Sequence, residues 1–327
     1  MRITLAPMEG VVDYLMRQLL TDTGGFDLCV TEFIRITNTL YPNSVFYRLC
    51  PELHDGCKTR SGTPVHMQLM GNDPTLMAEN ACKAARLGAL GIDLNFGCPA
   101  KTVNNHKGGA ALLKEPEAVY TIVSAVRSQV PDHIPVTAKM RLGYDSCEHA
   151  LDIALGIEAA GADSLAIHAR TRKEGYRPPA HWEILARIRE QLRIRLTANG
   201  EIWTAEDYYR CRAVSGCSDI MIGRGAIARP LLAANIKASM RGSEQNFQED
   251  SWPETRAVVL NFAEKILSSP GGRDHPYGVE HPEKYLADRL KQWLRMMTKG
   301  HSEAAELFNN VKQHKCAKAI LSELKAA

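Results

Sequence analysis

The feature that most constrains the fold is a regular alternation of short aliphatic runs with amphipathic segments over the first three quarters of the chain. Each run is closed by Gly, Pro or a charged residue, which is typical of buried strands in a parallel sheet. The alternation therefore predicts an α/β protein. We expect its strands at residues 3–8, 28–33, 64–70, 91–97, 135–143, 164–170, 195–202 and 219–225.

The segments between these runs favour helices. The clearest is 73–88, which begins at Asp73-Pro74 and ends at Gly88, residue types that favour the two ends of a helix. Alternating strands and helices of this number predict a (β/α)8 TIM barrel. An open, doubly wound sheet is the weaker alternative, because no G-x-G-x-x-G motif follows the first strand. Four more helices are expected at 115–130, 148–161, 181–192 and 204–216.

The pattern changes after about residue 242. A polar stretch, "GSEQNFQEDS", is expected to link the barrel to a strand-free tail. Ser251 and Glu254 form a capping-box pattern at the start of the first tail helix. We therefore expect a catalytic barrel domain at 1–242 and a small all-helical domain at 252–327. Its helical segments would be 251–269, 281–300 and 301–327, with an exposed loop at 270–281.

Composition narrows the class of protein. The chain has 327 residues, of which 45% are hydrophobic and 24% charged, and it has no apolar run near the ~20 residues of a membrane helix. No signal-peptide pattern opens it. The nine cysteines are odd in number and include no C-x-x-C pair, which favours reduced thiols over disulfides or a zinc site. We expect a cytoplasmic protein without a metal.

Charge is unevenly placed. Residues 1–251 hold 28 Lys and Arg against 28 Asp and Glu, whereas residues 252–327 hold 12 against 9. The formal net charge of +3 thus resides in the tail. Such an excess is compatible with a polyanionic partner, and a solvated helical surface explains it equally well.

Polar residues gather at the ends of the expected strands. The active site of a TIM barrel lies at the carboxyl ends of its strands, so these side chains should share one rim. A single buried polar residue is often only a hydrogen-bonded core residue, whereas so many on one rim are harder to explain by packing. The set comprises Pro7, Met8, Glu9, Gly10, Glu32, Arg35, Gln68, Asn95, Cys98, Lys139, Arg141, His168, Arg170, Asn199, Gly200, Glu201, Gly223, Arg224 and Gly225.

Cys98 is the most informative of these residues, since it follows an apolar run and stands between Gly97 and Pro99. It could be a small buried residue, a metal ligand, or an acid or nucleophile. Neither Cys98 nor His106 has partners at metal-ligand spacing. A thiol with an ordinary pKa of ~8.5 is mostly protonated at neutral pH, so it is a plausible proton donor.

Other rim residues suit an anionic, heterocyclic ligand. "ANGEI" and "IGRGA" follow the last two strands, where barrels often bind phosphate and where small residues let backbone N–H groups approach. Lys139 lies inside an apolar strand, where an ammonium needs an anion or an electron-rich ring. Gln68 offers both a donor and an acceptor. The loop "ARTRKEGYR" adds basic groups and Tyr176, which suit phosphates and base stacking.

The motifs "APMEG", "TEF", "QLMG", "DLNFGCPAKTV", "GGAALL", "AKMRLG", "IHARTRKEGY", "ANGEI" and "MIGRGA" together closely resemble the tRNA-dihydrouridine synthases from Leu5 to about Pro230. Arg35 and the tail motif "ADRLKQWL" are most similar to the subfamily that acts on uridine 16 of the tRNA D-loop. The resemblance implies an FMN enzyme that takes a hydride from NADPH and passes it to C6 of a flipped uridine. It also implies a monomer whose partner is tRNA.

The resemblance assigns roles to individual positions. Cys98 would protonate C5 of the uridine, on a loop hinged at Gly108-Gly109. The positions implied for tRNA or its uridine are Arg35, Asn95 and Tyr176, together with Arg289, Lys291 and Trp293 in the tail. The positions implied for FMN are Pro7, Met8, Glu9, Gln68, Lys139, His168, Asn199, Gly200, Glu201, Gly223 and Arg224.

Two departures and two alternatives remain at this stage. Lys107 stands where family loops commonly carry glycine, and the tail segment "PGGRDHPYGVEHPEKY" is longer than usual. The chain could instead be a flavin barrel dehydrogenase acting on a free pyrimidine such as dihydroorotate, against which the basic rim loop argues. It could also be a non-catalytic RNA-binding barrel, against which the intact set Cys98, Lys139 and His168 argues.

Overall fold

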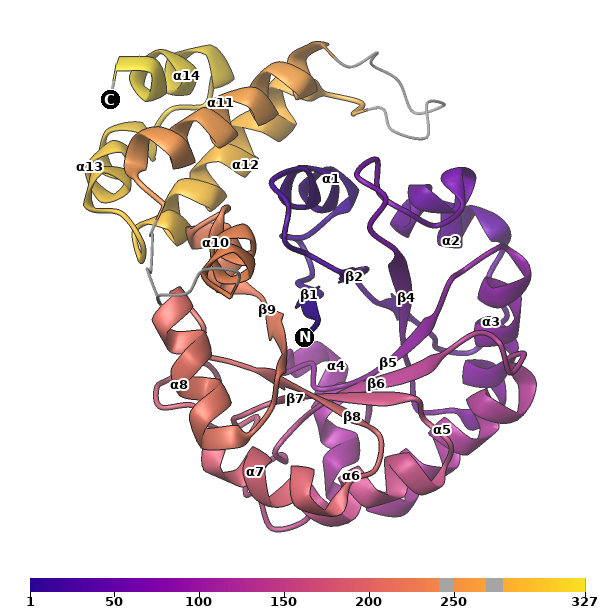
Figure 1. Ribbon diagram of the computed structural model, residues 1–327. Helices are drawn as coiled ribbons and strands as arrows, with labels where there is room; N and C mark the ends of the chain where they lie inside the picture. Colours follow the sequence, from indigo (N-terminus) through magenta and orange to yellow (C-terminus); the bar gives the residue numbers. More distant parts are fainter. Residues whose placement is uncertain (241–249, 269–278, 327) are drawn as a thin grey trace. The chain divides into compact units, whose positions relative to one another are not determined.

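Parallel strands close into a barrel in the computed structural model, which describes residues 1–240, 250–268 and 279–326 (Figure 1). The last strand pairs with the first, and the second pairs with the strand at 65–70, so the sheet has no open edge. All eight expected strands are confirmed. They are β1 (Ile3–Leu5), β2 (Leu28–Val30), β4 (Val65–Met70), β5 (Ile92–Phe96), β6 (Val136–Arg141), β7 (Ser164–His168), β8 (Arg195–Asn199) and β9 (Asp219–Ile222). A further two-residue strand, β3 (Ile34–Arg35), pairs with the end of β4.

The barrel helices begin where the sequence indicates. In α3 (Pro74–Arg86) the Asp73 carboxylate accepts the backbone N–H of Leu76 at 2.9 Å, and Pro74 occupies the first turn. Figure 1 shows the predicted helices outside the strands: α3, α5 (Pro116–Gln129), α6 (Ala150–Ala159), α7 (Trp182–Gln191) and α8 (Ala205–Ser215). Shorter helical segments that the sequence had not assigned are α1 (Tyr14–Asp22), α2 (Asn43–Leu49), η1 (Pro51–Asp55), α4 (Lys101–Asn104), η2 (Gly109–Lys114), α9 (Arg224–Ala228) and α10 (Leu232–Ser239).

The barrel interior contains both an apolar cluster and buried polar side chains. Ala6, Val30, Ala166 and Met221 form a buried cluster, and strands as distant as β2 and β7 can meet only inside the barrel. On β5, successive side chains alternate between the two faces of the sheet. The Asp93 carboxylate accepts hydrogen bonds from Gln68 on β4 and Thr137 on β6, so it points inward and lies beneath the site described below.

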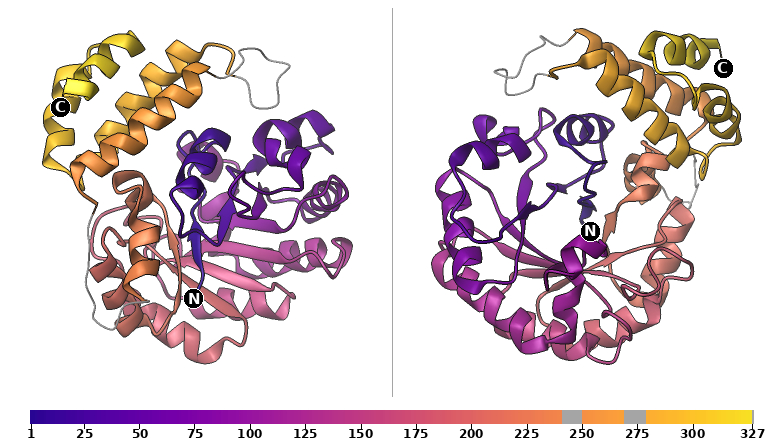
Figure 2. Two further views of the ribbon diagram at one scale, coloured as in Figure 1. Left: turned by 45° about the horizontal axis from the view of Figure 1, so that its top comes forward. Right: turned by 180° about the vertical axis from the view of Figure 1, so that it is seen from behind.

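The chain divides into two compact units. The first comprises residues 1–17, 26–202 and 207–223, and the second comprises 18–25, 203–206 and 224–327. The tail helices of the second unit lie side by side in both views of Figure 2. They are α11 (Trp252–Ser268), α12 (Pro282–Met297), α13 (Ser302–Val311) and α14 (Ala317–Ala326). The functional boundary between 242 and 252 stays a prediction, and most of the expected linker and of the 270–281 loop lies outside the described residues.

The tail folds around its own apolar core. The Phe262 ring meets Trp293 edge-on, with ring centroids 5.3 Å apart. The capping box is confirmed, because the Glu254 carboxylate accepts both the backbone N–H and the hydroxyl of Ser251, at 2.9 and 2.7 Å. The segment 301–327 forms two helices, since a turn at 312–316 separates α13 from α14. Within the described residues, no helix is both long and apolar enough to cross a membrane.

Candidate active site

A chain of buried hydrogen bonds links β4, β5 and β6 and runs toward the carboxyl end of the barrel. Thr137 donates to the Asp93 carboxylate at 2.6 Å, and the Gln68 amide donates to its other oxygen at 2.7 Å. The Gln68 carbonyl oxygen then accepts the amide of Asn95 at 2.8 Å. Gln68 is fully buried, so both ends of its amide are directed by protein groups.

Asn95 carries this chain to the cysteine loop. Its side-chain oxygen accepts the backbone N–H groups of Gly97 and Cys98, at 2.9 and 3.0 Å. From the other side, the Asn104 amide donates to the Cys98 carbonyl at 3.0 Å. Both the N–H and the carbonyl of Cys98 are therefore held, although the residue lies beyond the end of its strand.

The Cys98 thiol is half-buried. Burial raises its pKa above the ordinary thiol value, and the Glu9 carboxylate raises it further. The backbone N–H of Ala100 and the charges of Arg141 and Lys139 oppose this rise without cancelling it. The sulfur is thus protonated at neutral pH and suits a proton donor better than a nucleophilic thiolate.

Lys139 lies on β6 opposite Asn95 of β5 and supplies the cation of the site. Burial lowers its pKa to about 8, and Arg141 lowers it further, whereas Asp93 and Cys98 act in the opposite direction. Among the described residues its ammonium makes no hydrogen bond or ion pair. A cation in this position would gain by meeting an anion or an electron-rich ring.

Backbone and ring approach closely at the end of β8. A Cβ on Gly200 would lie 2.8 Å from Cδ2 of His168, and the φ angle of Gly200 is +114°. Only glycine fits this place without displacing His168. The His168 ring lies 3.3 Å from the guanidinium of Arg170, which is buried and ion-paired with Glu201. Asn199 donates to the Met221 carbonyl at 2.8 Å and ties β8 to β9.

The residues after β1 and β9 line the neighbouring part of the rim. Pro7 and Met8 are half-buried and Glu9 is exposed. A Cβ on Gly223 would lie 3.3 Å from the Met8 sulfur, so the two loops touch. Arg224 opens α9 in the second unit, and its guanidinium lies 5.1 Å from the centre of the Trp203 ring.

The three predicted RNA contacts of the barrel differ in exposure, and Asn95 is only 8% exposed. The Tyr176 ring is 52% exposed and lies 5.9 Å from the His168 ring and 5.2 Å from the Arg141 guanidinium. Arg141 itself is fixed by the carbonyls of Gly97, Thr171 and Gly175. Arg35 is half-buried in β3, and its carbonyl accepts the hydroxyl of Tyr41 at 2.9 Å.

The three predicted tail contacts differ in their surroundings. Arg289 donates to Gln292 at 2.6 Å, and the Lys291 ammonium lies 3.6 Å from Asp288. Trp293 is only 1% exposed and packs in the tail core. Its ring therefore has no surface for RNA, and we correct its assignment to a core residue.

Three further details bear on the prediction. Asp93 and Thr137 had not been singled out, although an acidic residue two before Asn95 in an apolar strand must share its face.

Lys107 has a φ angle of +55°, which explains why glycine suits that position. In the described part of the chain, no group of three or more His, Cys, Asp or Glu could hold a metal ion.

Solved structures share this fold. A 2-naphthoyl-CoA reductase complex matches with a TM-score of 0.56 at 14% identity, over 73% of this chain and 50% of that one. Histamine dehydrogenase from Rhizobium sp. 4-9 matches with a TM-score of 0.55 at 14% identity, over 80% and 48%. At such low identity the likeness shows the fold alone. The molecule is thus a (β/α)8-barrel protein with a polar, cationic site at the carboxyl ends of its strands.

Sequence comparison assigns the family. The model of the dihydrouridine synthase (Dus) family matches residues 4–325. The chain is 50% identical over 313 residues to the tRNA-dihydrouridine(16) synthase of Pseudomonas syringae pv. tomato, covering 96% of this chain and 95% of that protein. It is 47% identical over 319 residues to the protein of the same name from Neisseria meningitidis serogroup B, covering 98% and 92%. The chain belongs to the dihydrouridine synthase family.

Proposed function

We propose that this protein reduces the C5=C6 bond of uridine 16 in the D-loop of tRNA, with FMN as its bound cofactor and NADPH as its electron donor. The observation that carries the proposal is the combination of Cys98, held by Asn95 at the end of β5, with near-full-length similarity to proteins named for this reaction. We further propose that it acts in the cytoplasm as a monomer.

The residues present fit a flavin phosphate and ring. Gly200 has no Cβ and packs closely against the His168 ring, and a glycine in the loop after β8 lets backbone N–H groups approach an anion. Among the described residues the Lys139 ammonium makes no hydrogen bond or ion pair, and it would bind the electron-rich ring system. We infer that the other positions implied for FMN contribute to the same site: Pro7, Met8, Glu9, Gln68, Asn199, Glu201, Gly223 and Arg224.

The chemistry of uracil defines what Cys98 must do. The C5=C6 bond is conjugated to the C4 carbonyl, so hydride addition at C6 leaves negative charge that requires a proton at C5. When bound, reduced FMN supplies that hydride. Cys98 gives its thiol proton to C5, and its raised pKa keeps that proton available. Asn95 acts as a positioning residue, because its amide oxygen holds the Cys98 backbone.

We infer that RNA binds through both barrel and tail. Tyr176 is exposed beside Arg141 and can stack on a base, and Arg35 lies on the same barrel rim. In the tail, Arg289 and Lys291 would contact phosphates, which set register without reading sequence. The domain at 252–327 would thus dock tRNA while the barrel at 1–242 carries the chemistry.

Three measurements test this function. Purified protein should be yellow and release FMN on heating. It should form dihydrouridine in tRNA and not in free uridine, which separates it from a dehydrogenase of free pyrimidines. Deleting the gene should abolish dihydrouridine at position 16. Protein that carries no flavin under any condition would leave only the non-catalytic RNA-binding alternative.

A further inference from the structure

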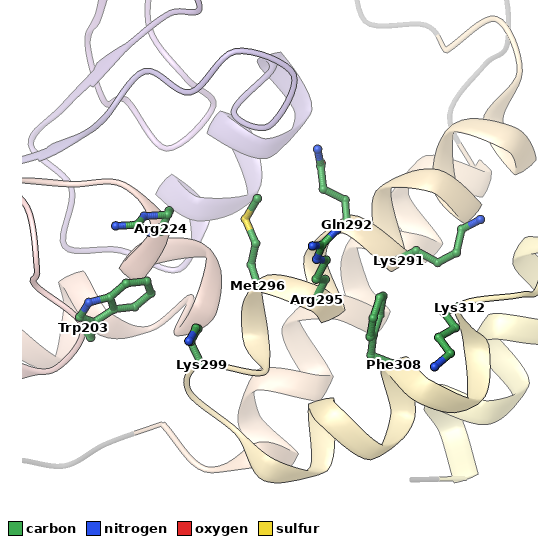
Figure 3. Close-up of a pocket in the computed structure, with 9 residues that line it drawn as sticks. All are labelled: Trp203, Arg224, Lys291, Gln292, Arg295, Met296, Lys299, Phe308 and Lys312. Atoms are coloured by element: carbon green, nitrogen blue, oxygen red, sulfur yellow. The ribbon is translucent and has the colours of Figure 1, made fainter. Parts of the chain in front are cut away.

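The second compact unit contains a basic pocket of about 590 Å³. Volumes in this range suit a small ligand or one unit of a polymer. Figure 3 shows the side chains that surround it. The lining residues are Trp203, Arg224, Lys291, Gln292, Arg295, Met296, Lys299, Phe308 and Lys312.

The lining is strongly cationic. It includes five Lys or Arg side chains and no carboxylate. Lys291 has a nearby acid, Asp288, at 3.6 Å, and Lys312 donates to Asn309 at 3.0 Å. Arg295 and Lys299 are exposed, and neither pairs with an acidic side chain in the part of the chain that the structure describes. The pocket therefore favours an anion.

Aromatic surface accompanies the charge. Phe308 is half-buried on α13, and its ring borders the pocket (Figure 3). Trp203 borders it from the loop after β8, with the Arg224 guanidinium 5.1 Å from its ring centre. A cationic wall with an aromatic face is the combination that holds an unpaired nucleotide, through its phosphate and its base.

The spacing of the cations favours a strand over a single small ligand. Lys291 and Arg295 stand one helical turn apart on α12, about 6 Å along its axis. Lys299 follows after four more residues, just beyond the helix end at Met297. Such a row can follow several successive phosphates, whereas a pyrophosphate would occupy only one step of it.

We propose that this pocket seats one unpaired nucleotide of the tRNA, distinct from the uridine that reacts at Cys98. The base contacts Phe308, and the flanking phosphates lie along Arg295 and Lys299. The inference rests on the proposed function and adds Phe308, Lys299 and Lys312 to the RNA-binding surface. It gives the tail a recognition pocket in addition to dispersed phosphate contacts.

Two pocket variants and one matched control test the proposal. Lys299→Gln removes an exposed pocket charge, and Phe308→Leu keeps apolar volume while removing the ring. Lys318→Gln removes an exposed charge on α14, outside the pocket lining, and is the control. The equilibrium binding of full-length tRNA to flavin-loaded enzyme is measured at several salt concentrations, and thermal melting verifies folding.

We expect Phe308→Leu to weaken binding about tenfold at unchanged salt slope, because base stacking is lost and charge is not. Lys299→Gln should weaken binding and reduce the slope by about one unit or less. Lys318→Gln should behave as wild type. Quenching of Trp203 fluorescence by tRNA, absent in Trp203→Phe, would be a direct sign of occupancy.

Either of two results overturns the inference. One is that Phe308→Leu and Lys299→Gln both bind tRNA like the Lys318→Gln control. The other is that adenosine 2′,5′-bisphosphate quenches Trp203 and tRNA does not, which would assign the pocket to a small nucleotide. If wild-type enzyme nevertheless forms dihydrouridine in tRNA, the proposed function stands and only the pocket assignment fails.

Discussion

Replacing Asn95 by alanine should test how the cysteine loop is held. Asn95 is 8% exposed and makes three hydrogen bonds through its side chain, one to Gln68 and two from the backbone of Gly97 and Cys98. At roughly 0.5–1.5 kcal/mol each, their loss should lower the free energy of unfolding by about 2–4 kcal/mol. The buried Gln68 oxygen would also lose its donor, which places the cost at the upper end.

Asn104→Ala is the matched control. Asn104 also donates to the Cys98 carbonyl, at 3.0 Å, and to that of Ala100, at 2.7 Å. Its own side-chain oxygen is buried without a partner among the described residues. Removing that oxygen relieves a cost, so Asn104→Ala should lower the free energy of unfolding by about 1 kcal/mol or less.

The assay combines thermal unfolding with two activities, dihydrouridine formation in tRNA and NADPH oxidation by oxygen. Asn95→Ala should lose dihydrouridine formation far more than NADPH oxidation, because only dihydrouridine formation requires a correctly positioned Cys98 thiol. If Asn95→Ala melts at the same temperature as Asn104→Ala, or forms dihydrouridine at the wild-type rate, the hydrogen-bonded chain does not position Cys98.

Three more predictions concern the same rim. Cys98→Ala should keep FMN and NADPH oxidation and lose most dihydrouridine formation. In the wild-type enzyme, the rate of dihydrouridine formation should fall with rising pH only above the ordinary thiol pKa of ~8.5, because the raised pKa of Cys98 keeps the thiol protonated below it. In flavin-free protein the free energy of unfolding should rise with pH between about 8 and 10.5, where the unfolded chain binds more protons at Lys139, and Lys139→Met should flatten this rise. Gly200→Ala should lower flavin content and stability more than Gly56→Ala, whose positive φ is similar in kind but whose Cβ would meet nothing within 4 Å.

The elements of the barrel could be predicted because their signals are local. Each strand is a short aliphatic run, and the start of α3 is specified by Asp73-Pro74. The start of the tail helix α11 is specified just as locally, by Ser251 and Glu254. The position of Cys98 could also be predicted locally, because a residue that directly follows a barrel strand lies at the carboxyl-terminal rim, where the active site of a TIM barrel is found.

Some local information was available and was overlooked. Trp293 shares its helix face with Leu286, Leu290 and Met297, positions that recur every three or four residues and are all buried. That periodicity already indicates a core residue. In the same way, the period of two along β5 places Asp93 on the face of Asn95.

The contacts that make the site work were decided by the tertiary structure alone. Gln68 lies 27 residues from Asn95 in the chain, and they meet only because closure of the barrel places β4 beside β5. Gly200 must be glycine because the His168 ring, from the neighbouring strand, fills the space where a Cβ would stand. The basic pocket likewise needs Trp203 and Phe308 brought together by folding of the second unit. A sequence specifies strands and caps through near neighbours, whereas these contacts depend on register and on rotation about each helix, which only packing fixes.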